Sequence, residues 1–310
     1  MIENYNVSKN PSTSSFVDIK KYLGVASINI LAINPNNEKL RQFGWSIPED
    51  ADEPSYFTDV ERDGKIVRRT RIRILAQIQD LEDKPTVALD FFVSPEAQVK
   101  TDGSKCKVID GYCRTAWVTK SELTSHSIPQ YSNGPASISP DYKVCHRGEE
   151  ELVKFIAKYT NITPLQVFDR ASNSWVASKK PGKLTIDNWK ALCEGNIQEI
   201  AEYVAMQPQN RVKVALGVVT TDDNKTYQTF LNGTYIGNGA TPDISTGEYK
   251  TARKAIDQFN QDRLNSQSSV RYTFSAKPVS EWRETASEVS DNSENFSTPS
   301  VDDEDLPFAM

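Results

Sequence analysis

The sequence contains few of the residues on which many enzymes and extracellular scaffolds depend. It has two histidines and four cysteines in 310 residues. Four cysteines make no disulfide framework in a chain of this length, so a reducing cytoplasm is the simplest compartment. No run of about 18 apolar residues occurs, which argues against a membrane-spanning helix. The start, MIENYNVSKNPSTSSF, lacks a basic segment followed by an apolar one, so we expect no secretory signal.

Recognisable catalytic and metal-binding motifs are also missing. The chain has no G-x-S-x-G, no P-loop and no H-E-x-x-H. Cys106 and Cys113 have six residues between them, and Cys145 adjoins His146. Zinc sites favour two to four residues between ligands, so we expect buried or idle thiols, no metal and no cofactor. The sequence argues against an enzyme, although a metal-dependent nuclease with an unrecognised carboxylate site remains an alternative.

Positive charge is missing from the C-terminal end. From Glu284 to Met310 there are eight acidic residues and no Lys or Arg, whereas the whole chain has 42 acidic and 36 basic residues. Residues 1–283 therefore hold 34 acids against 36 bases, a net charge of +2. A mildly basic body joined to an acidic tail is typical of proteins that interact with nucleic acid.

Hydrophobic periodicity divides the body of the chain into strands and helices. Alternating and β-branched segments predict strands over 24–33, 64–80, 84–94, 105–113, 114–123, 210–220, 225–237 and 270–276. Amphipathic spacing predicts helices over 148–160, 185–196, 196–206 and 247–264. Residues 34–57 and 172–184 are interpreted as loops. Short strands with helices between them predict an α+β fold with a small β-barrel or sandwich core.

Composition divides the chain into three regions. Residues 1–20 are rich in Asn and Ser and are expected to form a flexible N-terminal arm. Residues 21–283 are expected to form the folded domain, with a helical insertion around 148–206. Residues 284–310 have little apolar content, which is typical of a disordered acidic tail.

The strand predicted over 64–80 has the densest positive charge in the chain. Because successive strand residues point to opposite faces, Arg69, Arg71 and Arg73 should form a row on one face, roughly 6.5–7 Å apart. That spacing is close to the repeat of an extended phosphate backbone, and guanidinium groups suit phosphate. The alternative is a solvated face whose cations pair with acids on a neighbouring strand. The candidate phosphate contacts are Lys65, Arg68, Arg69, Arg71 and Arg73.

Aromatic residues near basic segments are candidates for stacking on bases, because any base can stack on a ring. Tyr227 and Phe230 are three residues apart, so in a strand they should face opposite sides and one of them should belong to the core. A single ring of this kind belongs to a core more often than to a binding surface, and the sequence does not separate the two. The candidates are Trp117, Trp175, Tyr227, Phe230 and Tyr235.

The chain ends in VDDEDLPFAM (301–310), a block of acids followed by an apolar tip. After a linker of Ser, Asn and acids, this order of parts resembles the acidic C-terminal tip of bacterial and phage single-stranded DNA-binding proteins. The resemblance covers about seven of the 310 residues. The matching residues are Asp302, Asp303, Glu304, Asp305, Leu306, Pro307 and Phe308.

This resemblance implies a fold and a set of partners. The larger phage members of that family have an OB-fold, which would make the barrel core of residues 21–283 OB-like and nucleic-acid-binding. In the family the tip recruits replication, recombination and repair proteins, and it competes with DNA for the basic groove. Such competition is physically reasonable, since the tail carboxylates form a polyanion as DNA does.

The leading hypothesis is a phage-type protein that coats single-stranded DNA without sequence preference, in the cytoplasm of a bacterial host. Its partners would be single-stranded DNA and, through the tail, replication or recombination proteins, with no membrane. A structural or assembly protein of a virion with an acidic partner-binding tail is the alternative from another class. The nuclease is the third.

Overall fold

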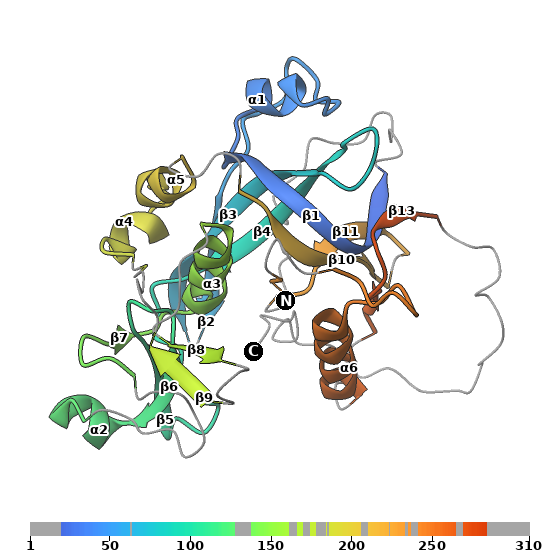
Figure 1. Cartoon of the computed structure of the whole chain (residues 1–310). Coiled ribbons are helices and arrows are strands. Elements are labelled where there is room, and N and C mark those ends of the chain that lie inside the picture. Colours follow the sequence, from blue (N-terminus) through green and yellow to red (C-terminus); the bar gives the residue numbers. More distant parts are fainter. Residues whose placement is uncertain are drawn as a thin grey trace, which may run out of the picture. The chain divides into compact units, whose positions relative to one another are not determined.

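The computed structural model (Figure 1) describes residues 20–62, 64–127, 138–160, 166–169, 174–177, 184, 186–205, 210–222, 224–232, 235–236, 241–264 and 269–283. The side chains of residues 62, 166–169 and 174–177 lie outside this description. The expected arm, except Lys20, and the whole expected tail also lie outside it. The described chain combines helices with antiparallel strands, which agrees with the predicted α+β class.

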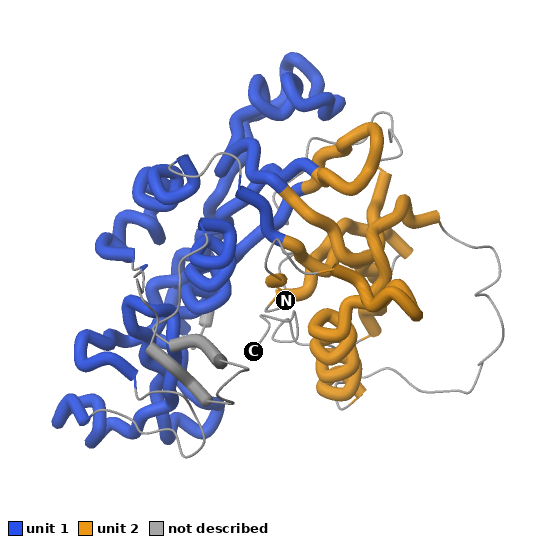
Figure 2. The backbone as a smooth tube through the Cα atoms, viewed as in Figure 1, with its two compact units in different colours: residues 1–13, 29–77, 88–212 blue, residues 14–28, 78–87, 213–310 orange. Residues whose placement is uncertain are grey.

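The described chain divides into two compact units that are not consecutive in sequence (Figure 2). The first takes described residues from 29–77 and 88–212, and the second takes them from 14–28, 78–87 and 213–310. Sequence interpretation treats 21–283 as one domain. Composition does not reveal the division, because the boundaries fall inside four strands, β1 (Lys21–Ile33), β3 (Lys65–Ile78), β4 (Thr86–Val93) and β10 (Val212–Thr220).

The first unit holds the remaining N-terminal and middle elements. Its strands are β2 (Phe57–Arg62), β5 (Lys105–Ile109), β6 (Thr115–Thr119), β7 (Lys143–Val144), β8 (Gln166–Asp169) and β9 (Ser174–Ala177). Its helices are α1 (Asn37–Gln42), α2 (Lys120–Ser125), α3 (Glu149–Tyr159), α4 (Trp189–Cys193) and α5 (Gln198–Ala205). β3 pairs with β2 and with β4, β5 lies between β6 and β7, and β8 pairs with β9.

The second unit is built around β10. This strand pairs antiparallel with β11 (Thr226–Phe230) and β12 (Arg271–Phe274), while β13 (Ser280–Trp282) pairs with the start of β1. Helix α6 (Lys250–Leu264) supplies Ala252 and Ile256 to a core that also contains Val25, Ala215, Leu231, Ile236, Tyr249 and Ala276. The hairpin predicted around residues 221–224 is confirmed by the pairing of Thr220 with Thr226.

The barrel expectation is not met in its closed form. Within the described part of the chain, β2 pairs only with β3 and β11 only with β10. A closed barrel has no edge strands, because its first and last strands pair. The eight-stranded sheet that contains these strands is therefore open.

Three local predictions differ from the structure for identifiable reasons. Residues 120–125 form α2 rather than strand, because Thr119 and Glu122 make a reciprocal capping box at its start. Asn36 caps α1 inside the predicted 34–57 loop by accepting a hydrogen bond from the backbone of Lys39. β9 lies in the predicted 172–184 loop and is held by pairing with β8.

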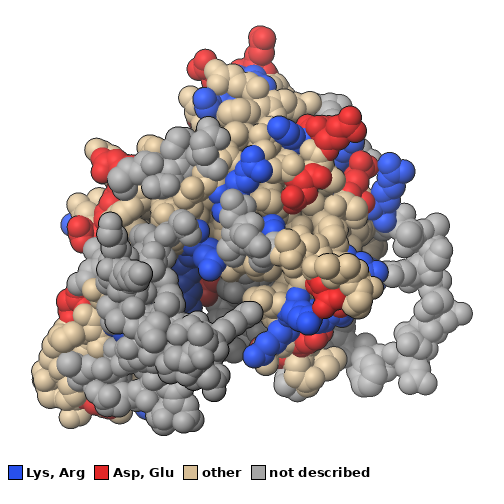
Figure 3. Space-filling model, in the orientation of Figure 1, with Lys and Arg blue, Asp and Glu red and all other residues tan. Residues whose placement is uncertain are grey.

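The helix predicted over 148–160, where the hydrophobic period is strongest, is confirmed as α3. In α3 the predicted inward face, with Phe155 and Tyr159 as its largest members, is buried. No helix among the described residues is long and apolar enough to cross a membrane. On the face drawn in Figure 3, described basic and acidic side chains are interspersed rather than separated into large patches.

Candidate nucleic-acid interface

Strand β3 has the alternation that its sequence predicts. Thr70 and Ile72 are completely buried. Arg69, Arg71 and Arg73 are half-buried and share the opposite face, because successive strand residues point in opposite directions. On β4, Asp90 and Phe92 alternate with buried residues in the same way. Contacts between these two sets, given below, show that both point to one side, which we call the arginine face.

Arg73 is tied to a carboxylate on this face. Its Nε and Nη2 donate to the two oxygens of Asp90 at 2.8 and 2.6 Å, a bidentate ion pair in which both side chains are about one-fifth to one-quarter exposed. Burial alone would lower the pKa of Arg73, but the hydrogen bonds and charge of Asp90 outweigh it and raise that pKa. Asp90 thus occupies the position that a phosphate would take on Arg73.

Arg68 is paired in a similar way, nearer to solvent. Its Nε and Nη2 donate to Asp59 at 3.0 and 3.3 Å, and the two residues lie directly opposite each other on β3 and β2. The hydrogen bond from Arg68 lowers the pKa of Asp59. Lys65, at the start of β3, is exposed. For Arg68 and Arg73, the alternative interpretation of cations paired with acids on neighbouring strands therefore describes the observed contacts.

Arg69 and Arg71 lie over aromatic rings instead. The guanidinium carbon of Arg69 is 4.0 Å from the ring centroid of Phe92, and that of Arg71 is 5.4 Å from the ring centroid of Tyr56. Arg71 Nη2 also donates to the Ser55 carbonyl at 2.9 Å. Burial, followed by the nearby charge of Arg73, lowers the pKa of Arg71. Both guanidinium groups lie within the range of a cation–π contact with a ring.

Tyr56 is fixed by its hydroxyl group. The hydroxyl donates to the Pro35 carbonyl at 2.6 Å, and burial raises the pKa of Tyr56 to about 12. The phenol is therefore neutral at physiological pH. Its ring serves as a rigid support for Arg71 rather than as a second charge.

Phe57 lies on the opposite face of the sheet from Arg69 and Arg71, because it is paired with Thr70, and 38% of its surface is exposed. It lies 5.4 Å from the guanidinium carbon of Arg68. Its other side packs on Gly195, where an added Cβ would come within 2.2 Å of the ring. Gly195 also has φ +92°, a conformation that favours glycine. The segment between α4 and α5, which contains Gly195, thus packs against Phe57 and fixes its position.

Buried polar contacts hold the segment that carries Gly195. Thr70 Oγ1 on β3 donates to the carbonyl of Cys193, the last residue of α4. Trp189 of α4 stacks on His146, with ring centroids 4.7 Å apart. His146 in turn contacts the buried carboxylate of Glu149 at 3.0 Å. This chain of contacts connects the core side of β3 to α4 and α3.

Glu149 is the buried charged residue of this chain of contacts between β3, α4 and α3. Its side chain is 1% exposed and is paired with Lys143 at 2.8 Å as well as with His146. Burial by itself would raise the pKa of Glu149, but the hydrogen bond from His146 and the charge of Lys143 lower it overall. A buried carboxylate satisfied by two partners is consistent with a structural role.

Sequence analysis did not single out Tyr56, Phe57 or Phe92, although their rings contact the candidate arginines. The only local signal is the Tyr-Phe pair at the start of β2, a strand with a single apolar residue after Phe57. The pairing of Phe57 with Thr70 and of Asp59 with Arg68 places these side chains. Such a register is a tertiary feature, so the pattern of β3 alone does not reveal it.

All of the predicted stacking residues lie outside β2, β3 and β4. Trp117 is on β6, opposite Lys107 of β5, with Lys107 Nζ 4.9 Å and Lys100 Nζ 5.7 Å from its ring. Lys107 is itself paired with Glu150 at 2.6 Å. Trp175 belongs to β9, and its side chain lies outside the described residues.

The other three candidate rings belong to the second unit. Tyr227 and Phe230 on β11 face opposite sides of the sheet, as predicted, and Tyr227 is 47% exposed while Phe230 is half-buried. The hydroxyl of Tyr235 donates to Asn232 Oδ1 at 3.3 Å. The tail residues 302–308 lie outside the described chain.

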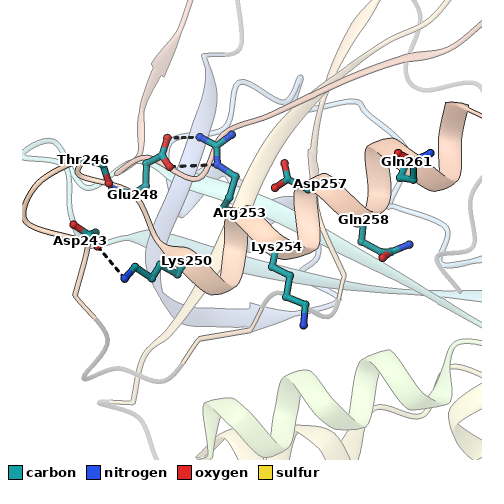
Figure 4. A pocket seen from close by; sticks show the side chains of 9 residues that line it. All are labelled: Asp243, Thr246, Glu248, Lys250, Arg253, Lys254, Asp257, Gln258 and Gln261. Atoms are coloured by element: carbon teal, nitrogen blue, oxygen red, sulfur yellow. Dashed lines mark hydrogen bonds and ion pairs between the residues drawn. The ribbon is translucent and has the colours of Figure 1, made fainter.

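A hollow of about 590 Å³ lies along the polar side of α6 (Figure 4). Two of its cations are paired with acids of the preceding loop, Lys250 with Asp243 at 3.2 Å and Arg253 with Glu248. Cations and acids are equal in number along it, so the hollow has no charge preference. Its lining residues are Asp243, Thr246, Glu248, Lys250, Arg253, Lys254, Asp257, Gln258 and Gln261.

Within the described ranges, no group of three or more His, Cys, Asp and Glu side chains is arranged to hold a metal ion. All four cysteines are free thiols. Burial raises the pKa of Cys113 and of Cys193 to about 12, so neither is an activated thiolate.

Comparisons with models of protein families, with curated proteins and with solved structures find no match to this chain.

Proposed function

We propose that this protein binds single-stranded DNA without sequence preference, and that the arginine face of β3 is its phosphate-binding surface. The observation that supports this most is the pair of arginines on one face of β3 whose guanidinium groups lie over the rings of Phe92 and Tyr56. Single-strand binders combine such cations with aromatic surfaces on which any base can stack.

The contacts divide the candidate cations into two groups. Arg69 and Arg71 are supported by rings, and Lys65 is exposed, so these three are proposed as direct phosphate contacts. Arg68 and Arg73 hold Asp59 and Asp90, so they are proposed to contact phosphate only by exchanging those carboxylates. Phe57 lies opposite Thr70, on the other face of the sheet, so it is not proposed as part of the arginine face.

The biological setting is part of the same proposal. The acidic tip at 302–308 would recruit replication, recombination or repair proteins in a host cytoplasm, as the resemblance implies. The open sheet is compatible with an OB-like core, since OB-folds are partly open barrels. No catalytic role is proposed.

The test is a fluorescence-polarisation titration with labelled oligo-dT of about 30 nucleotides, a length that covers the site sizes of OB-type binders. We expect binding that is stronger than to a duplex of equal length and that weakens steeply with salt. Arg69→Ala combined with Arg71→Ala should weaken it strongly. The matched control, Lys250→Ala with Lys254→Ala on α6, removes the same charge and should have little effect.

The outcomes separate the alternatives. Absence of binding to any single strand at low salt refutes the proposal and leaves the virion assembly protein as the better hypothesis. Cleavage of the oligonucleotide that depends on a divalent metal would favour the nuclease. Equal losses in the arginine and control variants would show that net charge, rather than the arginine face, drives binding.

A further inference from the structure

The second unit contains an aromatic surface that the arginine face does not explain. In the antiparallel pairing, Val219 of β10 lies opposite Tyr227 of β11 on one side and opposite Tyr272 of β12 on the other. Directly opposed residues in a sheet point to the same face. The three side chains therefore form one row, Tyr227–Val219–Tyr272, across the sheet.

The Tyr272 end of the row is rigid and positively charged. The guanidinium carbon of Arg263, from α6, is 4.4 Å from the ring centroid of Tyr272. Phe259 and Phe274 pack against the same tyrosine, with ring centroids 5.5 and 6.3 Å from it. Tyr272 is thus packed between α6 and the sheet, and these contacts fix the orientation of its ring.

The Tyr227 end is open. Nearly half of this side chain is exposed, and within the described residues no other ring or cation contacts its ring. Burying an exposed ring of this size in the core of the unit would stabilise the fold, yet the register of β11 directs it to the surface. The exposed residues Lys225 and Arg271 lie at the ends of the two outer strands.

The spacing of the row suits a flat ring. Neighbouring strands are about 4.8 Å apart, so β11 and β12 are separated by roughly 10 Å with Val219 midway. A ring placed over Val219 would lie about 5 Å from each tyrosine, within the range at which aromatic rings attract one another. Val219, between them, is a smaller side chain than either tyrosine and is half-buried.

We propose that the row Tyr227–Val219–Tyr272, with Arg263, is a second base-stacking subsite for single-stranded nucleic acid. The cations near it favour a polyanionic ligand: Arg263 lies over Tyr272 and Lys225 is exposed beside the start of β11, whereas Asp222 at the β10–β11 turn accepts a hydrogen bond from Ser269 at 2.7 Å. This inference rests on the proposed function, but it concerns residues of the other unit and has its own readout.

The test compares Tyr227→Ala and Tyr227→Phe in the full chain, using the oligo-dT titration. Tyr227→Ala should weaken binding by about five-fold or more, the usual effect of removing one stacking ring. Tyr227→Phe keeps the ring and should bind like the wild type. Thr273→Ala is the matched control, since Thr273 is exposed on the opposite face of β12 and should change nothing.

The dependence on salt gives a second, independent readout. Tyr227 carries no charge, so Tyr227→Ala should shift the whole binding curve while leaving the slope of log affinity against log salt unchanged. If wild-type protein binds but Tyr227→Ala binds equally well, the second subsite is wrong while the proposed function stands. If wild-type protein does not bind at all, the proposed function itself fails.

Discussion

Removing the two carboxylates that pair with Arg68 and Arg73, on the two faces of β3, should increase affinity for single-stranded DNA. The variant is Asp59→Asn with Asp90→Asn, which keeps the shape of both side chains and removes their charge. In the structure each carboxylate binds one arginine, Arg68 or Arg73, through two hydrogen bonds. A DNA single strand that binds the native protein must therefore displace these carboxylates, or its phosphates cannot contact Arg68 and Arg73.

The size of the effect follows from counterion release. Each cation that neutralises a phosphate of a single strand contributes about 0.7 to the slope of log affinity against log salt. Releasing Arg68 and Arg73 should steepen the slope by up to about 1.4, so lowering salt four-fold would strengthen binding by roughly seven-fold more than in the wild type. Polarisation titrations at several salt concentrations measure this directly.

A folding control is necessary because Arg73 is partly buried. The Asn side chain retains an acceptor oxygen for Arg73, so the loss of stability should be about 1 kcal/mol, the net value of one hydrogen bond. Urea denaturation checks that figure. The charge control is Asp257→Asn with Asp262→Asn on α6, both exposed.

An unchanged or shallower slope in the double variant would refute the idea that these carboxylates occupy phosphate positions. An equal rise in the α6 control would instead attribute the effect to net charge. Either result would require Arg68 and Arg73 to be regarded as purely structural.

Two further predictions concern the support beneath the interface. Gly195→Ala should destabilise the protein by roughly 1–3 kcal/mol, because the new Cβ meets the Phe57 ring and the φ of +92° disfavours a side chain. Denaturant unfolding measures this loss of stability. An unchanged unfolding midpoint would contradict the packing of Phe57 on Gly195. Glu149 has a pKa lowered in the folded state by His146 and Lys143, so its contribution to stability is complete above about pH 4.5 and is lost as pH falls through the lower folded pKa. Glu149→Gln should therefore flatten the acid side of the stability profile measured by thermal unfolding, and a profile that stays as steep as that of the wild type would contradict this role.

Strong local periodicity made several elements predictable. The alternation of β3, the hydrophobic face of α3 and the turn between β10 and β11 all follow from patterns within about 15 residues, and each is present in the structure. The opposite directions of Tyr227 and Phe230 follow from the same rule. These features depend on neighbours in sequence, so one segment is enough to predict them.

The partners of the arginines were not predictable in this way. β2, with the sequence FTDVER, has too few apolar residues to be identified as a strand, yet it supplies Phe57 and Asp59. Asp90 and Phe92 belong to a strand that was predicted, but nothing in that strand shows which residues of β3 they meet. The division into two units also escaped prediction, because it passes through the middle of strands.

The sequence by itself determined that this protein has a cation-rich strand with one buried face and an acidic C-terminal end. Only the tertiary structure decided that Arg68 and Arg73 are paired with acids while Arg69 and Arg71 lie over rings. The physical reason is strand register: a slip of one residue in β2 or β4 would turn Asp59 or Asp90 to the other face and exchange every one of these contacts. Register depends on the packing of the whole sheet, which no single strand encodes.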